Sequence, residues 1–409
     1  MRGALATNLR SMGRIYILGE MMSERIVTKV DFVVIGAGIA GASVGYWLAP
    51  HGKVVLLERE AHPGFHSTGR SAALYMASYG NAQVRALTLA SKRFFDAPPQ
   101  GFSEHPLLSP RGALMVAESG QETALEQHWA VLEQMKTGAR RLTPEQACEL
   151  SPALRPDRII DALIEPDAAD MDVHAIHQGY LRGLVARGGE VRVNSEVIEL
   201  VRHAEHWAVT TKGNEIWQAP IVIDAAGAWA DEIAHLAGAT RVGLQPCRRS
   251  ALLFKPEGFG DFSNWPMTYG ASENWYFKPD AGQVLVSPAN ADPVPPQDVQ
   301  PEELDIAIAI DRIESITRFK IRRPSHTWAG LRSFVEDHGL VGGFDEIKPG
   351  FFWIAAQGGY GIQTSPAMGE ACAALVRGMP IPPAIADWGL TKEMLSASRL
   401  SRLGSLGSP

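Results

Sequence analysis

Wholly apolar runs separated by a helical pattern mark the part of this chain that begins near residue 31. Residues 32–35 (FVVI) and 54–57 (VVLL) contain no polar residue, which is typical of strands buried on both faces of a parallel sheet. The apolar residues between these runs, through Trp47 and Leu48, follow helical spacing. A third such run, 221–223, comes much later in the chain. The pattern predicts a β-α-β unit whose sheet is completed by a distant segment, so we expect an interleaved α/β fold.

The segments outside these runs show other patterns. Residues 172–191 read as an amphipathic helix stopped by two glycines, and residues 293–317 as a loop followed by a second helix. Residues 247–254 and 273–279 read as strands. The segment 255–266 is rich in Gly, Pro and aromatic residues, and it fits either an active-site lid or a long hairpin connection.

A glycine motif follows the first apolar run. Gly36, Gly38 and Gly41 form GxGxxG, and the second run ends in Glu58. In this arrangement the first glycine allows a tight turn, the second lets the backbone approach a pyrophosphate, and the third lets helix and strand pack closely. The carboxylate accepts hydrogen bonds from ribose hydroxyls. Because strand, helix, second strand and acid all occur in order, the sequence predicts a bound dinucleotide.

Two further segments indicate a long dinucleotide. HSTGRSAA supplies hydroxyls at Ser67, Thr68 and Ser71 and a cation at Arg70, all suited to phosphate and ribitol oxygens. Small residues at 225–227 follow the third apolar run, where a cofactor backbone could pass. A ligand touched by such distant segments is long, which favours FAD over NAD. The alternative for HSTGRSAA is a polar loop that caps a helix.

A glycine-rich stretch near the end of the chain, QGGYGIQTSP (357–366), precedes a helical pattern. We expect Thr364 or Ser365 to cap that helix, with Pro366 in its first turn. A helix start presents unpaired N–H groups and a partial positive charge, so an electron-rich group could lie there. An ordinary tight turn before a surface helix is the alternative.

The set VVIGAGIAGAS, HSTGRSAA, DAAGAW, HTWAGLRS and QGGYGIQTS resembles the D-amino-acid oxidase superfamily of FAD enzymes, and within it the bacterial D-arginine dehydrogenases most closely. The similarity runs from about Asp31 almost to the C-terminus. It implies a Rossmann-like FAD-binding domain interleaved with an α+β substrate domain on a mixed sheet, and a final helix that starts at the pyrimidine end of the flavin. The division expected is residues 1–28 as an N-terminal extension, 29–95, 168–240 and 326–400 as the FAD-binding domain, and 96–167 and 241–325 as the substrate-binding domain.

The same resemblance implies the site residues. Those expected to meet the substrate are Tyr79, Arg249, Tyr276, Arg332, Gly359 and Gln363. Those expected to contact noncovalent FAD are Gly36, Gly38, Ile39, Ala40, Gly41, Glu58, Arg59, Ser67, Thr68, Gly69, Ser71, Ala72, Ala73, Val197, Ala226, Gly227, Gly358, Gly361, Ile362, Gln363 and Thr364.

The two arginines have the chemistry that a carboxylate requires, because a guanidinium binds it with two parallel hydrogen bonds and stays charged when buried. Arg248 and Arg249 begin a strand and therefore point to opposite faces, so one can enter a cavity while the other faces water. Taken singly, each arginine, and each tyrosine of the set, would more often be a surface or core residue.

The activity implied by the resemblance is oxidation of an amino acid. Its carboxylate docks on Arg249 and Arg332, hydride passes from Cα to flavin N5, and the imine hydrolyses to a 2-keto acid and ammonia. The D preference comes from the resemblance alone. Alternatives are a sarcosine-, glycine- or proline-type amine oxidase that yields hydrogen peroxide, a 2-hydroxy-acid dehydrogenase, or a flavin-binding subunit without turnover. No cysteine stands near Gly359 for a covalent flavin link.

Two segments match those that form the side-chain pocket of D-arginine dehydrogenase, but they lack the polar residues expected there. No acid occurs between Ser109 and Ala117, and Ala113 stands where an acidic residue is expected. Leu74 replaces a histidine, and Met76 is nearby. A buried cationic side chain would lose hydration there without gaining a partner. We therefore expect uncharged, apolar D-amino acids to be preferred, unless another acid, Glu104 or Glu273, takes the place.

Composition restricts the partners. A net charge of -7 with no basic stripe argues against nucleic acid, and three dispersed cysteines with scattered histidines suggest neither a zinc site nor disulfides. No window is apolar enough for a transmembrane helix, so we expect a cytoplasmic protein, with peripheral membrane association left open. The electron acceptor, a quinone or an electron-transfer protein, is not identified. Residues 1–21 could be a transit-like segment or precede a true start at Met21 or Met22.

Overall fold

The computed structural model describes residues 27–400, and the expectations for the first residues lie outside this range. Its central element is a six-stranded sheet that is parallel except for its last strand. The strand order is β10 (Glu190–Arg192), β3 (Val54–Leu57), β2 (Phe32–Ile35), β14 (Ile221–Asp224), β22 (Phe351–Ala355) and β21 (Val341–Phe344). The carboxyl ends of the parallel strands meet at one edge, where ligands of such sheets bind.

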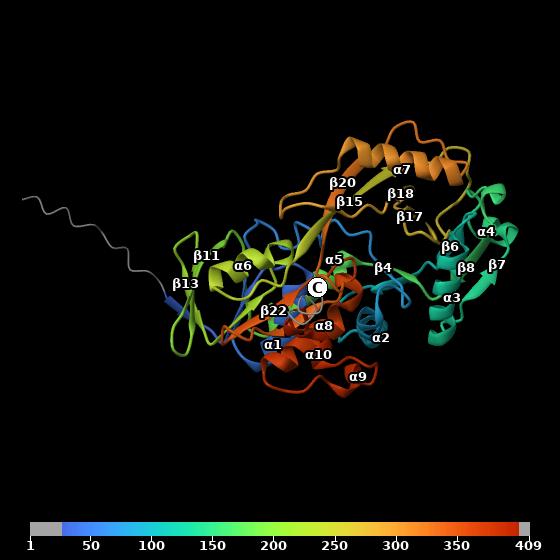
Figure 1. Cartoon of the computed structure of the whole chain (residues 1–409). Coiled ribbons are helices and arrows are strands. Elements are labelled where there is room, and N and C mark those ends of the chain that lie inside the picture. Colours follow the sequence, from blue (N-terminus) through green and yellow to red (C-terminus); the bar gives the residue numbers. More distant parts are fainter. Residues whose placement is uncertain (1–26, 401–409) are drawn as a thin grey trace, which may run out of the picture.

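Both faces of this sheet are covered, which explains why its strands are apolar throughout. Val34 and Leu56 face a cluster formed with helices α1 (Ile39–Leu48), α2 (Ala82–Asp96), α5 (Val173–Ala186) and α8 (Gly361–Val376). Val33 and Val55 face the opposite cluster, which contains α6 (Ala230–Ala237) and residues of a second, mixed sheet. Figure 1 shows α1 and α8 together below β22.

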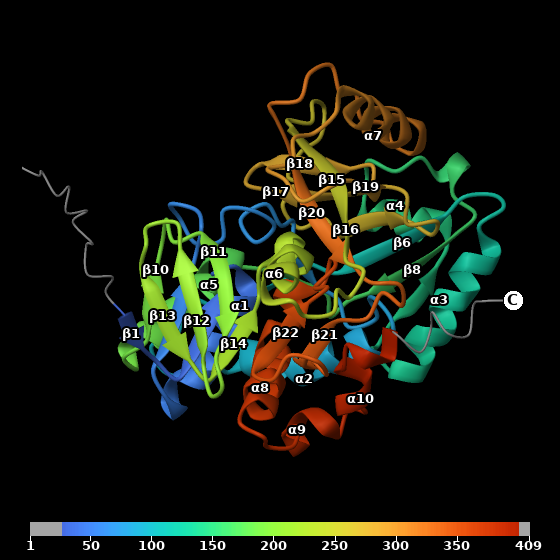
Figure 2. The same cartoon turned by 60° about the vertical axis from the view of Figure 1, so that its left-hand side comes forward.

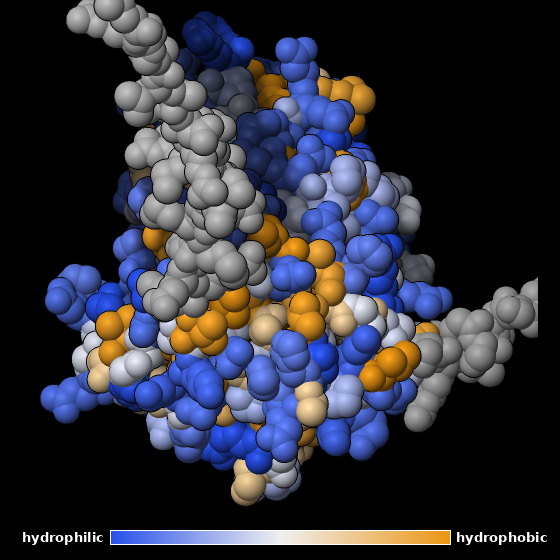
Figure 3. Space-filling model, turned by 90° about the vertical axis from the view of Figure 1, so that its left-hand side faces the viewer, coloured by the Kyte–Doolittle hydropathy of each residue, from blue (hydrophilic) through white to orange (hydrophobic). Residues whose placement is uncertain are grey.

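The second sheet has the order β1 (Val27–Lys29), β13 (Ile216–Ala219), β12 (Trp207–Thr211) and β11 (Val197–Arg202). Figure 2 shows it standing beside the parallel sheet. Figure 3 looks from that side, and apolar groups there are interspersed with hydrophilic ones. The exposed apolar residues of its strands are Val27, Ile198 and Val201. Scattered exposure of this kind is ordinary for a soluble surface.

The third sheet is nine-stranded and mixed. Its order is β19 (Asp292–Pro293), β15 (Gln245–Phe254), β18 (Gln283–Ser287), β17 (Tyr276–Asp280), β16 (Met267–Gly270), β6 (Ala113–Ala117), β8 (Asp161–Glu165) and β7 (Arg140–Leu142), and β20 (His326–Phe334) also pairs with β15. Helix α7 (Glu303–Ile316) packs on its outer face, and α3 (Glu122–Met135) packs on the other. Figure 1 shows α7 with β15, β17, β18 and β20 at the top of the molecule, and β6, β7 and β8 at its right.

Shorter elements connect these layers. A small sheet has the order β4 (Leu74–Tyr75), β9 (Ala169–Met171) and β5 (Leu108–Pro110). The remaining helices are α4 (Pro144–Leu150), α9 (Pro383–Ala386), α10 (Lys392–Leu395) and the 3-10 turns η1 (Ala49–His51), η2 (Pro156–Arg158) and η3 (Gly227–Trp229). No helix within residues 27–400 is long and apolar enough to cross a bilayer.

The architecture confirms the expected fold class, a Rossmann-like layer interleaved with an α+β part on a mixed sheet. Strand β20 falls in the segment 326–400 that the expected division gives to the FAD-binding part, yet its strand partner is β15 of the nine-stranded sheet. Residues 27 and 28 of the expected extension belong to β1, which pairs with β13. The segment 255–266 packs Phe259 and Phe262 against Trp265 in the outer cluster, and it contributes no residue to either cavity described below.

Candidate cofactor and substrate site

The glycine motif forms a turn that side chains would block. Gly36 has φ +99°, and a Cβ there would lie 2.5 Å from the carbonyl oxygen of Ala225 at the end of β14. A Cβ on Gly41 would lie 1.9 Å from the carbonyl oxygen of Gly36. The first glycine therefore lets the turn pass the neighbouring strand, and the third lets α1 pack against the turn.

Buried side chains hold the middle of this turn. The Ala37 N–H donates to Glu58 Oε2 at 2.9 Å, and His177 Nε2 lies 2.8 Å from the Ala37 carbonyl oxygen. Burial lowers the pKa of His177, so the neutral ring donates its Nε2–H to this oxygen. The Ile39 N–H donates to Thr68 Oγ1 at 3.0 Å. The start of α1 is thus fixed from three segments, with its positive end directed at the site.

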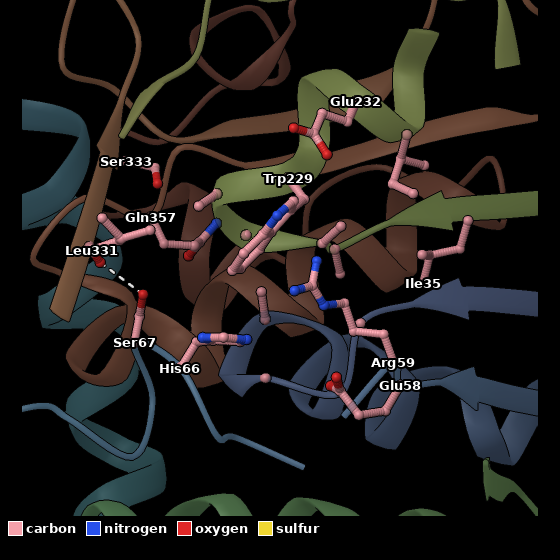
Figure 4. A pocket seen from close by; sticks show the side chains of 18 of the residues that line it. Ile35, Glu58, Arg59, His66, Ser67, Trp229, Glu232, Leu331, Ser333 and Gln357 are labelled. Carbon is pink, nitrogen blue, oxygen red and sulfur yellow. Dashed lines mark hydrogen bonds between the residues drawn. The ribbon is translucent and has the colours of Figure 1, made fainter. Parts of the chain in front are cut away.

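A cavity of about 410 Å³ lies at this edge of the sheet. Figure 4 shows Glu58 and Arg59 on one side of it and His66 and Ser67 on another, with Trp229 between them. The predicted cofactor residues that line it are Gly36, Gly38, Ile39, Ala40, Glu58, Arg59, Ser67, Thr68, Val197, Ala226, Gly227 and Gly358.

Trp229 is the main aromatic group of this cavity. The Arg59 guanidinium lies 4.2 Å from the centre of its ring, and the His66 ring centre lies 4.6 Å away. His66 Nε2 contacts Glu60 Oε1 at 2.9 Å, whereas its Nδ1 is buried with no partner within the described residues. Such planar, cationic and hydrogen-bonding groups suit an adenosine diphosphate unit.

A second cavity of about 100 Å³ continues from the first. The two cavities share six lining residues, which are Ile39, Ser67, Thr68, Leu331, Gln357 and Gly358. One long ligand could therefore extend from the first cavity into the second. This continuity fits FAD, whose adenosine and flavin ends lie far apart. The predicted residues that line only the second cavity are Ser71, Ala72, Arg249, Tyr276, Arg332, Gly359, Gly361 and Ile362.

Arg332, on β20, reaches into the second cavity. Its Nη1 donates to the Tyr79 hydroxyl at 3.2 Å, although Tyr79 does not itself line the cavity. A Cβ on Gly359 would lie 2.8 Å from the same nitrogen, so only glycine lets the guanidinium lie against the backbone there.

Arg249, on β15, enters the same cavity, and its Nε donates to the carbonyl oxygen of Asn290. Burial and the positive charge of Arg332 lower the pKa of Arg249 to about 10, so both arginines are charged at neutral pH. Within residues 27–400 neither forms an ion pair with an acid. Two half-buried cations without an acidic partner among the described residues have the chemistry that suits an anion.

Arg248 points away from the cavity, as strand alternation requires, but the expectation that the opposite face is open to water is wrong. Its Nε donates to Asp305 Oδ2 at 2.8 Å beneath α7, and it also pairs with Glu302 and Asp292. A helix covers that face, so the charge is neutralised by a buried network instead of by solvent.

Helix α8 differs from the expectation at its start. It begins at Gly361 with Tyr360 as its N-cap, and Pro366 lies inside it, so the prediction of Thr364 or Ser365 as the cap is wrong. The Ser365 hydroxyl donates to the Ile362 carbonyl at 2.9 Å and so satisfies the oxygen that the missing Pro366 N–H leaves free.

Gln363 is buried behind this helix start and lines neither cavity. Its Oε1 accepts from the Met76 N–H at 3.1 Å, and its Nε2 donates to Thr88 Oγ1 at 3.0 Å. Both ends of the amide are therefore used inside the protein. The other predicted cofactor residues outside both cavities are Gly41, Gly69, Ala73 and Thr364.

Several lining residues were not predicted. Trp229, Trp328 and Gln357 stand inside the recognised motifs DAAGAW, HTWAGLRS and QGGYGIQTS, so their position in the motif could have identified them. Others, at positions 195, 196, 232 and 241, lie in segments without a motif, and only the fold brings them to the cavity.

Comparison with known proteins agrees with this geometry. A bovine (Bos taurus) protein, FAD-dependent oxidoreductase domain-containing protein 1, is 22% identical, and the match covers 85% of this chain and 81% of the relative. The crystal structure of L-proline dehydrogenase from P. horikoshii superposes with a TM-score of 0.78 at 20% identity, covering 92% of this chain and 99% of the other. The crystal structure of glycine oxidase from Geobacillus kaustophilus superposes with a TM-score of 0.77 at 19% identity, covering 89% of this chain and 99% of the other.

A model of the DAO family, described as FAD dependent oxidoreductase, matches residues 31–375. This match spans the glycine motif, both cavity arginines and most of α8. The protein is therefore an oxidoreductase of the DAO family that uses FAD.

Proposed function

We propose that the protein is an FAD-dependent D-amino-acid dehydrogenase that converts its substrate to a 2-keto acid and ammonia through an imine. The observation that carries the proposal is the pair of half-buried guanidinium groups of Arg249 and Arg332, which line the smaller cavity without an acidic partner within residues 27–400. Like charges placed together in a low dielectric repel each other, and a bound carboxylate relieves the repulsion. The arrangement therefore favours a substrate with a carboxylate.

The amino end of the substrate is positioned by backbone in this proposal. Gly359 lies against Arg332, so a substrate whose carboxylate binds the guanidinium brings its α-nitrogen within reach of the Gly359 carbonyl, which can accept from N–H. Tyr276 lines the same cavity and restricts the orientation of Cα. FAD, when bound, accepts the hydride from Cα. The residues around it then act mainly by orienting the substrate. Orientation alone can remove a large part of the activation free energy of such a reaction.

The lining chemistry favours an amine over a hydroxy acid. None of the described residues that line the smaller cavity is a histidine, aspartate or glutamate. Oxidation of a hydroxyl group needs a base to remove its proton, whereas a neutral amine supplies its own electron pair as the hydride leaves. A sarcosine-, glycine- or proline-type amine oxidase is therefore the second hypothesis, and a 2-hydroxy-acid dehydrogenase is the third. Hydrogen peroxide yield separates the amine oxidase from a dehydrogenase.

The apolar cluster that packs around Tyr276 supports an uncharged substrate side chain in this proposal. Leu74, Met76 and Ala113 lie in one apolar cluster with Tyr276, whereas Glu104 is exposed. Glu273, the other acid considered, is exposed as well. A cationic side chain would be desolvated in this cluster, and the acid beside it, Glu165, the strand partner of Ala113, already accepts hydrogen bonds from Ala77 and Ser78. We propose a preference for D-amino acids with apolar side chains, and a quinone or an electron-transfer protein as the acceptor of the electrons.

The decisive experiment is an anaerobic panel of D- and L-amino acids and 2-hydroxy acids, followed by bleaching of the flavin absorbance. The proposal expects rapid bleaching by D-amino acids and formation of the matching 2-keto acid with ammonia. Bleaching by 2-hydroxy acids alone would replace it by the hydroxy-acid hypothesis, and bleaching by L-amino acids alone would refute the preference for D-amino acids. A chain that binds flavin and is bleached by none of these compounds, nor by glycine or sarcosine, would be a non-catalytic subunit.

A further inference from the structure

Glu165 is a buried acid that takes no part in the site described above. It ends β8, and the whole residue is 2% exposed. Its Oε1 accepts from the Ala77 N–H at 3.1 Å, and its Oε2 accepts from the Ser78 hydroxyl at 2.5 Å. Within residues 27–400 no lysine, arginine or histidine pairs with it. Burying an acid without a cationic partner costs free energy, so we expect Glu165 to have a structural or functional role.

The two hydrogen bonds hold the segment directly before Tyr79. The Met76 N–H is bound by Gln363 of α8, and residues 77 and 78 are bound by Glu165 of the nine-stranded sheet. On the other side, Arg85 Nη1 donates to the Gly80 carbonyl. The backbone on both sides of Tyr79 is thus fixed by side chains from separate elements.

Tyr79 in turn contacts the predicted carboxylate site. Its hydroxyl accepts from Arg332 Nη1 at 3.2 Å, and its ring meets the Tyr360 ring edge-on at 5.1 Å between centres. Tyr360 is the N-cap of α8, which begins beside the smaller cavity. A shift of Tyr79 would therefore move a partner of the Arg332 guanidinium.

We infer that Glu165 is a positioning residue for carboxylate binding, which acts by holding Ala77 and Ser78 so that the Tyr79 hydroxyl orients Arg332. The inference rests on the proposed function, because it presumes that Arg332 binds a substrate carboxylate. Glu165 lines neither cavity, so it acts through Tyr79 and not by contact with substrate. Its carboxylate suits this task because it offers acceptors on both oxygens to two neighbouring donors.

The test is a double-mutant cycle on the flavin-loaded enzyme. Benzoate, a carboxylate without a transferable α-hydrogen, is titrated while the flavin absorbance is followed. The variants are Glu165→Gln, Tyr79→Phe and the double variant, with exposed Glu133→Gln on α3 as the matched control. Glutamine keeps the size of the side chain but offers one acceptor and turns an N–H₂ group toward the other donor. We expect Glu165→Gln to raise the benzoate Kd about 10-fold in the wild-type background and less than 2-fold when residue 79 is Phe, because coupled residues are not additive.

Equal factors in both backgrounds, or no change in Kd on Glu165→Gln, would overturn the inference. If Glu165→Gln does not fold with flavin, Ser78→Ala breaks one of the two hydrogen bonds and leaves the acid in place, and the same non-additivity with Tyr79→Phe is expected at about 3-fold. Arg332→Met in the same titration tests the proposed function separately. An unchanged Kd in that variant, or no benzoate binding by the wild type, would refute the carboxylate site itself and the inference with it.

Discussion

Replacing Arg332 by methionine removes a charge from the centre of the proposed substrate site while leaving most of its volume filled. The guanidinium lies in the smaller cavity, donates to the Tyr79 hydroxyl at 3.2 Å, and packs against Gly359. It does not line the larger cavity, where the adenosine end of FAD is expected. We therefore expect flavin content and folding to be retained, and substrate binding to be lost selectively.

The size of the effect follows from the hydrogen bonds removed. A hydrogen bond to a charged group contributes about 1.5 to 3 kcal/mol, and Arg249 remains to hold the carboxylate in part. The net loss should be on the order of 2 to 4 kcal/mol, which corresponds to a fall in kcat/KM of roughly 30- to 1000-fold. Tyr79 loses a donor but keeps its own hydroxyl, so a further penalty from that side is small.

The assay is anaerobic reduction of the bound flavin, with the rate measured at increasing concentrations of a D-amino acid. Arg322→Met, at an exposed position before β20, is the matched control and should behave as the wild type. Both variants should release the same amount of flavin per protein. If Arg332→Met reduced its flavin at the wild-type rate and with the wild-type concentration dependence, Arg332 would not bind the substrate.

The remaining predictions concern the cofactor, the pH dependence and the substrate. Because no cysteine lies near Gly359, acid precipitation should release all flavin into the supernatant, and yellow protein in the pellet would contradict this. Carboxylate binding favours charged Arg249, whose pKa in the free site is about 10, so benzoate affinity should be constant below that pH and fall as the pH rises through it. The step should vanish in Arg249→Met, and its persistence there would assign it to another group. With an artificial electron acceptor, kcat/KM should be higher for D-leucine than for D-arginine, because Leu74, Met76 and Ala113 are apolar and the adjoining Glu165 already binds Ala77 and Ser78. A preference for D-arginine would mean that an acid reaches the pocket.

The cofactor half of the site was predictable because its chemistry is local. A GxGxxG turn needs glycines at fixed spacing, since a Cβ at Gly36 or Gly41 meets backbone atoms at 2.5 Å and 1.9 Å. The acid at the end of the next strand also comes at a fixed distance along the chain. Such constraints leave a pattern in the sequence, and the pattern identified the β-α-β unit, its Glu58 and the FAD-type fold.

The parts that were not predictable depend on contacts between distant segments. The sequence of QGGYGIQTSP suggests a helix start at Thr364 or Ser365, because Pro366 is favoured in a first turn. The helix instead begins at Gly361, because the Ser365 hydroxyl takes over the hydrogen bond that Pro366 cannot make. The buried partners of Arg248 are also separated from it by 44 to 57 residues, so no local pattern marks them.

The same long-range contacts determine which residues meet the ligand. Gln363 and Glu165 are both polar and both close to Tyr79 in the fold, yet each uses its side chain to bind backbone or hydroxyl groups of the segment before Tyr79 or of α2. Arg332 has one protein hydrogen-bond partner for its five N–H groups within residues 27–400, the Tyr79 hydroxyl. A half-buried guanidinium with donors to spare lies where a ligand can satisfy them, whereas an amide or carboxylate with both terminal atoms bonded inside the protein lies where it orients others. Hydrogen-bond capacity left over in the folded protein therefore separates the group that binds substrate from those that position it, and this capacity is set by the fold and not by the motif.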